Sequence, residues 1–145
     1  MDTATANQKQ SLPRGIRNNN PLNIRNSNNA WLGKVQGTDR AFESFDTMEH
    51  GIRAAFIILR TYIRKHGCRF VSDLISRFAP SSENNTAAYI ERVLKISNTA
   101  PREPLFFERR LQMCTILYAM HIVECGKSYI PLSEFTRIYD KYFNS

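Results

Sequence analysis

The longest apolar segment of the chain, residues 105–125, constrains the possible folds most strongly. Apolar residues recur along it at the spacing of one helix face, at Phe107, Leu111, Cys114, Tyr118 and Ile122. A second apolar side is formed by Ile116, Leu117 and Met120. A helix that is apolar on more than one side is buried inside a protein. We therefore expect 105–125 to be the central helix of the fold, ended by Gly126.

Four shorter amphipathic segments predict further helices. They cover approximately residues 46–66, 71–78, 85–97 and 131–142. Asp46 and Glu49 have the spacing of a capping box, in which the Asp side chain accepts from the amide three residues on and the Glu side chain reaches back. Pro80 ends the second of these helices, because proline disfavours helical geometry in the residue before it. Together with residues 105–125, these segments predict about five helices.

The N-terminal third has a different character. Residues 1–12 lack apolar periodicity and are expected to be a disordered arm. Residues 34–45 predict a short β-hairpin with its turn at Gly37, Thr38 and Asp39. We thus expect a single domain over residues 13–145 that is mostly α (α+β), with a small β-hairpin lobe near its N-terminus.

Composition narrows the function classes. The 145 residues carry a formal net charge of +7, which favours acidic surfaces or polyanions as partners. No recognition helix or basic-aromatic strand motif is present, which disfavours nucleic acid as the partner. The three cysteines form no C-x-x-C pair and no zinc-binding pattern, so free thiols, no metal and no cofactor are predicted. No apolar run approaches the roughly 20 residues of a membrane span, and no signal-peptide core is found.

The stretch "RGIRNNNPLNIR", residues 14–25, has two interpretations. Asparagine side chains can stabilise a loop by bonding its backbone, or they can present amides to sugar hydroxyls and acetamido groups. The nearby Trp31 can stack on a sugar face or plug the small lobe. The arginines of residues 14–25 can bind carboxylates or phosphates, or remain solvated. The candidate substrate-binding residues are Asn18, Asn19, Asn20, Asn23, Trp31, Arg17 and Arg25.

Seven ordered blocks carry a family resemblance. They are "RGIRNNNPLNIR", "WLG", "QGTD", "FESF", "GIRAAF", "LRTYIRKHG" and "FAPSSENNTAAYI". In this order they resemble a family of phage and prophage proteins, often labelled structural protein P-five, that is widespread in gut Bacteroidetes. The resemblance covers residues 13–97 and implies a lysozyme-like fold.

A second resemblance concerns the Asn-rich stretch and the hairpin. "NNPLNIR", "WLG" and "FESF" are similar to a region of bacterial wall glucosaminidases and lytic transglycosylases, in which loop and hairpin form one wall of a glycan cleft. The implied function is a phage-derived peptidoglycan glycan-strand hydrolase or lytic transglycosylase. Its partners would be glycan strands and other virion proteins. It would be made in the bacterial cytoplasm and act, once delivered, at the cell wall or in the virion.

The same comparison leaves catalysis open. Those enzymes carry a catalytic glutamate shortly before the asparagine loop, whereas here the one acid upstream of Pro21 is Asp2. The alternative is therefore a non-catalytic lysozyme-like virion or cell-wall-binding protein. Glycoside cleavage needs a carboxylic acid with a raised pKa. Glu83, Asp39 and Glu43 are the candidates by their positions in or beside loops, although Glu83 also suits a helix N-terminus and Asp39 an ordinary turn.

Overall fold

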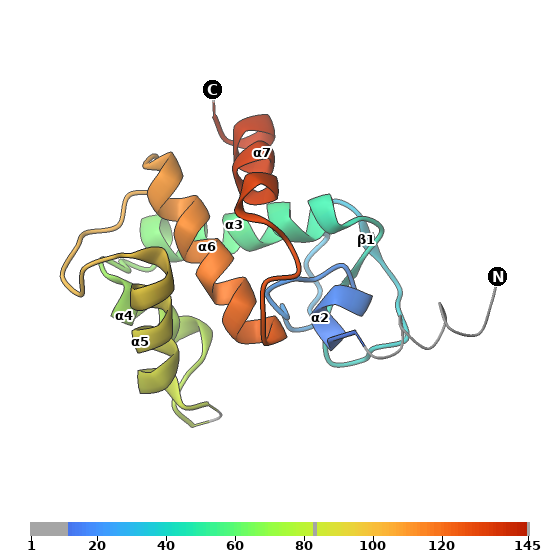
Figure 1. Cartoon of the computed structure of the whole chain (residues 1–145). Helices are drawn as coiled ribbons and strands as arrows, with labels where there is room; N and C mark the ends of the chain where they lie inside the picture. The colour runs from blue at the N-terminus through green and yellow to red at the C-terminus, as the bar shows by residue number, and fades with distance from the viewer. Residues whose placement is uncertain (1–11, 83, 145) are drawn as a thin grey trace.

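The computed structural model describes residues 12–82 and 84–144, and this part of the chain is mostly helical (Figure 1). Its six helices are α2 (Arg14–Arg17), α3 (Met48–Lys65), α4 (Val71–Phe78), α5 (Thr86–Ser97), α6 (Arg110–Cys125) and α7 (Leu132–Tyr142). The strands β1 (Lys34–Val35) and β2 (Ser44–Phe45) pair antiparallel, with Lys34 opposite Phe45. These elements confirm the predicted fold class. The short helix α2 was not predicted, and the disordered arm falls almost entirely outside the described residues.

Helix α6 is the central helix, as predicted. It contacts α5, α7, α2 and α3, and Figure 1 shows it crossing the middle of the molecule. Its buried side chains cover more than one side: Met113, Cys114, Ile116, Leu117, Ala119, Met120, His121 and Cys125. The helix begins at Arg110 and not at Leu105, because residues 105–109 cross to another segment. There the Leu105 amide donates to the Arg69 carbonyl at 2.8 Å.

The capping box predicted for α3 was wrong. The N-cap is Thr47, whose hydroxyl accepts from the His50 amide at 3.2 Å. Asp46 instead contacts the His50 ring, with Oδ1 2.6 Å from Nδ1. Glu49 points away from the cap and accepts from Lys141 Nζ at 2.7 Å. Its carboxylate therefore joins α3 to α7.

His121 joins α6 to two loops. Its Nε2 accepts the backbone N–H groups of Tyr129 at 3.2 Å and Ile130 at 3.3 Å. Nδ1 must then carry the proton, and it faces the Pro21 carbonyl at 3.4 Å. The side chain is fully buried, and this burial lowers the pKa of His121. The neutral ring thus holds the Asn-rich loop, which is the part of residues 14–25 that follows α2, against the segment before α7.

The three cysteines are buried and unpaired, as predicted. Burial raises the pKa of Cys68, and it raises the pKa values of Cys114 and Cys125 to about 12. Cys125 Sγ lies 3.6 Å from the Pro21 carbonyl, beneath the Asn-rich loop. None of the helices in the described part is long and apolar enough to cross a membrane.

Candidate functional site

The Asn-rich loop is shaped by its own side chains. Asn19 and Asn23 adopt left-handed backbone angles, with φ of 53° and 52°, which asparagine tolerates better than most residues. Asn20 is fully buried. Its Nδ2 donates to the carbonyls of Ile24 at 3.0 Å and Glu43 at 2.9 Å, and its Oδ1 accepts from the Ile24 amide at 2.9 Å. Asn20 therefore replaces the hydrogen bonds that a strand partner would provide.

The loop also packs closely against α3 and β2. Asn19 Nδ2 donates to the Phe45 carbonyl at 3.0 Å, and the Phe45 amide donates to the Asn18 carbonyl at 2.9 Å. The Asn19 carbonyl lies over Gly51 of α3, where a Cβ atom would be 1.8 Å from the carbonyl oxygen. Only glycine at position 51 permits this approach. The position of the loop is therefore fixed from both sides.

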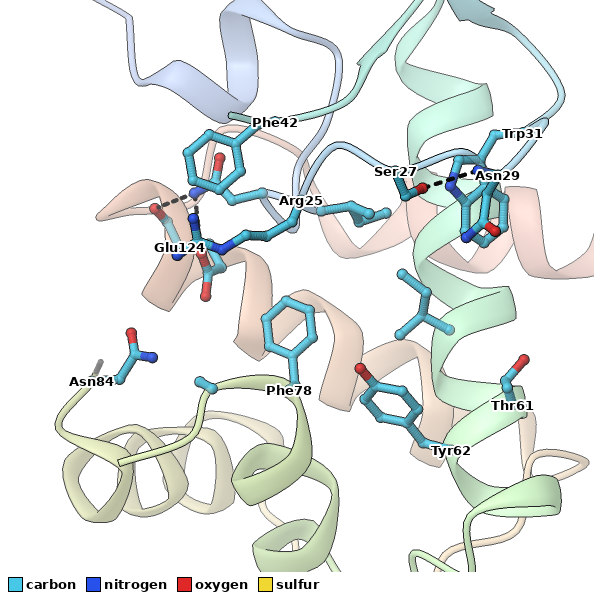
Figure 2. A pocket seen from close by; sticks show the side chains of 14 residues that line it. Arg25, Ser27, Asn29, Trp31, Phe42, Thr61, Tyr62, Phe78, Asn84 and Glu124 are labelled. Carbon is cyan, nitrogen blue, oxygen red and sulfur yellow. Dashed lines mark hydrogen bonds between the residues drawn. The ribbon is translucent and has the colours of Figure 1, made fainter. Parts of the chain in front are cut away.

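A cavity of about 470 Å³ lies between this loop, its continuation to Trp31, and helices α3, α4 and α6. We call it the Glu124 cavity. Figure 2 shows Arg25 and Glu124 at one end, Trp31 and Asn29 at the other, and Phe78 and Tyr62 on the opposite wall. Aromatic rings therefore lie on both walls of the cavity, together with hydrogen-bonding groups. Such a combination is typical of small-molecule and sugar sites.

Glu124 is the one carboxylate among the described residues that line this cavity. It lies in the last turn of α6, where its Oε1 accepts from Asn23 Nδ2 at 3.0 Å and its Oε2 from the Tyr89 hydroxyl at 2.8 Å. Burial raises the pKa of Glu124, and this effect outweighs the two hydrogen bonds and the nearby Arg25, which act in the opposite direction. The site therefore holds a carboxyl group that retains its proton to higher pH than an exposed glutamate.

Asp39 lies outside the Glu124 cavity. Its carboxylate pairs with Arg14, with Nη2 2.9 Å from Oδ1, and accepts from Asn18 Nδ2 at 3.0 Å. The Arg14 guanidinium holds the pKa of Asp39 well below its usual range. Asp39 is consequently ionised and has no proton to donate at neutral pH. Arg17 and Asn18 line a separate hollow beside this pair.

Glu43 lies behind the cavity wall. Its side chain is fully buried, accepts from Ser27 Oγ at 2.9 Å, and pairs with Lys34 Nζ at 3.1 Å. The same ammonium donates to the carbonyls of Ser27 at 2.6 Å and Asn29 at 3.2 Å. The pair therefore fixes the segment that carries Asn29 to the cavity. Glu83, the remaining catalytic candidate, lies outside the described residues.

Three predicted substrate-binding residues meet at the cavity: Asn23, Arg25 and Trp31. The Arg25 guanidinium lies 5.3 Å from the centre of the Phe42 ring, which also lines the cavity. Trp31 both lines the cavity and packs against the hydrophobic core. Asn19 and Asn20 instead direct their amides to the backbone.

Sequence reasoning missed Glu124, although one signal marks it. It is the one acidic residue within Arg110–Cys125, and it stands in the last turn. A carboxylate there is repelled by the negative end of the helix dipole, which favours cations. An acid in this position calls for another explanation.

The described residues contain no group of three or more His, Cys, Asp or Glu side chains that could hold a metal ion.

Comparison with known proteins identifies one relative. No family model matches the chain. Protein P5 of Pseudoalteromonas phage PM2 is 46% identical to it over 90 residues, which cover 59% of this chain. The chain spans 56% of the length of that protein, or about half. Over more than half of its own length, this chain is therefore similar to a phage protein.

Proposed function

We propose that the Glu124 cavity binds a glycan strand of peptidoglycan and cleaves it, with Glu124 as the general acid. The observation that carries this proposal is the environment of Glu124. A carboxyl group with a raised pKa lies in a partly aromatic cavity, where it faces groups that can hold a polar, neutral ligand. Proton donation to a leaving oxygen requires such an acid at neutral pH.

The lining suits an N-acetylated sugar. The rings of Trp31 and Tyr62 can cover the apolar faces of a pyranose, while the Asn29 amide can pair with hydroxyl and acetamido groups. Arg25 can bind a carboxylate of the peptide stem, since a guanidinium pairs bidentately with carboxylates. A strand bound here would lie between the wall formed by the Asn-rich loop and the wall formed by α3 and α4.

The single lining carboxylate favours a lytic transglycosylase. In this reaction the Glu124 proton passes to the glycosidic oxygen as the bond from that oxygen to C1 of N-acetylmuramic acid breaks. The C6 hydroxyl oxygen of the same sugar attacks C1, and its proton returns to Glu124. The products are a new free sugar end and a 1,6-anhydro sugar. The reaction therefore consumes no water and needs no second protein carboxylate. Retaining and inverting hydrolases, by contrast, use two carboxyl groups.

The test is digestion of purified peptidoglycan, with soluble products identified by chromatography and mass spectrometry. We expect the parent chain to release anhydromuropeptides and Glu124→Gln to be slower by about 100-fold or more, because general acids contribute that much. Glu91→Gln, which changes an exposed acid of α5, is the matched control and should keep full activity. Absence of products from the parent, or undiminished activity of Glu124→Gln, would refute the proposal.

The second candidate is a non-catalytic cell-wall-binding or virion protein. It is favoured by the absence of a second carboxylate among the described lining residues. The similarity to a phage protein supports either function in a phage context. Co-sedimentation with insoluble peptidoglycan without released products would establish binding alone. Released muropeptides would exclude this candidate.

A further inference from the structure

The Glu124 carboxyl group is approached from two sides. A second cavity of about 300 Å³ shares Asn84 and Glu124 with the Glu124 cavity and is also lined by Tyr89 and Arg92 of α5. Tyr89 is not part of the lining of the Glu124 cavity itself. Its hydroxyl therefore bonds the carboxyl group at 2.8 Å without Tyr89 lining the cavity proposed for the substrate.

The two hydrogen-bond partners of Glu124 differ in chemistry. Asn23 Nδ2 can only donate, so Glu124 Oε1 must accept from it whether or not the carboxyl group is protonated. The Tyr89 hydroxyl can donate or accept. It donates to Oε2 of the carboxylate, and more weakly to the same oxygen once that oxygen carries the proton, which leaves the proton free to point into the Glu124 cavity. Tyr89 is 6% exposed, so most of its side chain is held in place by packing.

We propose that Tyr89 is the positioning residue of Glu124, holding Oε2 in both protonation states and setting the pH at which the carboxyl group loses its proton. The contact itself is independent of any reaction, whereas its catalytic consequence rests on the proposed function. A group held in both states keeps its geometry while the proton leaves and returns.

The neighbouring charges define what Tyr89 contributes. Arg25 approaches from the Asn-rich loop, Arg92 lines the second cavity, and Cys125 follows Glu124 on α6. Burial and the adjacent carboxylate raise the pKa of Tyr89 well above its ordinary value, so its hydroxyl keeps its proton near neutral pH. Removing this donor takes a hydrogen bond from the ionised form of Glu124. Tyr89→Phe should therefore raise the pKa of Glu124 further.

The direct test is a carbon-13 NMR titration of the Glu124 carboxyl group in glutamate-labelled protein. Tyr89→Phe should move its midpoint upward by roughly half to one pH unit, the equivalent of one net hydrogen bond. Tyr118→Phe is the matched control, because it also removes one phenol hydroxyl. That hydroxyl donates to Ser128 Oγ at 3.1 Å, and Tyr118 lines neither cavity. This control should leave the midpoint unchanged. An unchanged or lowered midpoint in Tyr89→Phe would overturn the assignment.

The pH profile of peptidoglycan cleavage separates this inference from the proposed function. A general acid loses activity as pH rises through its pKa. In Tyr89→Phe the descending limb of the kcat profile should therefore move to higher pH, by the shift seen in the titration. A matching movement supports both conclusions. A shifted titration with an unmoved limb would support Tyr89 as the partner of Glu124 but overturn Glu124 as the acid.

Discussion

Replacing Asn20 by alanine should cost this protein about 3 kcal/mol of folding free energy. The side chain makes three buried hydrogen bonds, two with Ile24 and one with the Glu43 carbonyl. The Ile24 carbonyl also accepts from the Glu43 amide at 2.9 Å, so it stays paired after the substitution. The Ile24 N–H group and the Glu43 carbonyl lose their partners. Each such buried group costs about 1–3 kcal/mol.

Urea unfolding followed by circular dichroism measures this loss, and thermal unfolding should show a midpoint lower by roughly 10 °C. Asn26→Ala is the matched control, because Asn26 is exposed and its side-chain Nδ2 makes only a long hydrogen bond, of 3.4 Å, to the Arg40 carbonyl. That variant should stay within about 0.5 kcal/mol of the parent. If Asn20→Ala were no less stable than Asn26→Ala, buried amide bonds would not be what fixes the loop.

Three further predictions concern single residues. Gly51→Ala places a Cβ atom 1.8 Å from the Asn19 carbonyl, so it should lower the free energy of unfolding by about 2 kcal/mol or more in the same urea assay. His121 has a lowered pKa in the folded protein, so stability should fall as pH drops below about 6.5; the non-titrating His121→Gln should lack this slope between pH 7 and 5. Glu124 has a raised pKa, so its contribution is present in acid and lost as pH rises; Glu124→Gln should therefore gain stability relative to the parent between pH 4 and pH 7, and a constant difference would contradict the assigned burial.

The helices could be predicted because their signals are local. The spacing of apolar residues requires no knowledge of the partner, and the predicted starts and ends of α4 and α5 agree with the structure. The cap of α3 failed because two neighbours compete for the same position. Asp46 is held by the His50 ring, which leaves the cap to Thr47. Such a choice between adjacent polar residues depends on side chains that fold over them.

The candidate site could be predicted only in part. Asn23 and Trp31 were identified because their residue types suit a glycan wall, and both line the Glu124 cavity. Glu124 itself meets Asn23 across a sequence separation of 101 residues. No local pattern reports such a contact. The burial that raises its pKa is likewise a product of packing between α5, α6 and the loop, so the acid could be recognised only in three dimensions.

The three buried thiols bear on where the folded protein can function. A thiol reacts with oxidants and disulfides as its thiolate, and a pKa of about 12 leaves roughly one part in 10⁴ of Cys114 or Cys125 ionised at pH 8. Burial also denies an oxidant access to the sulfur atoms. A molecule folded under reducing conditions would therefore keep its covalent structure when moved to oxidising surroundings.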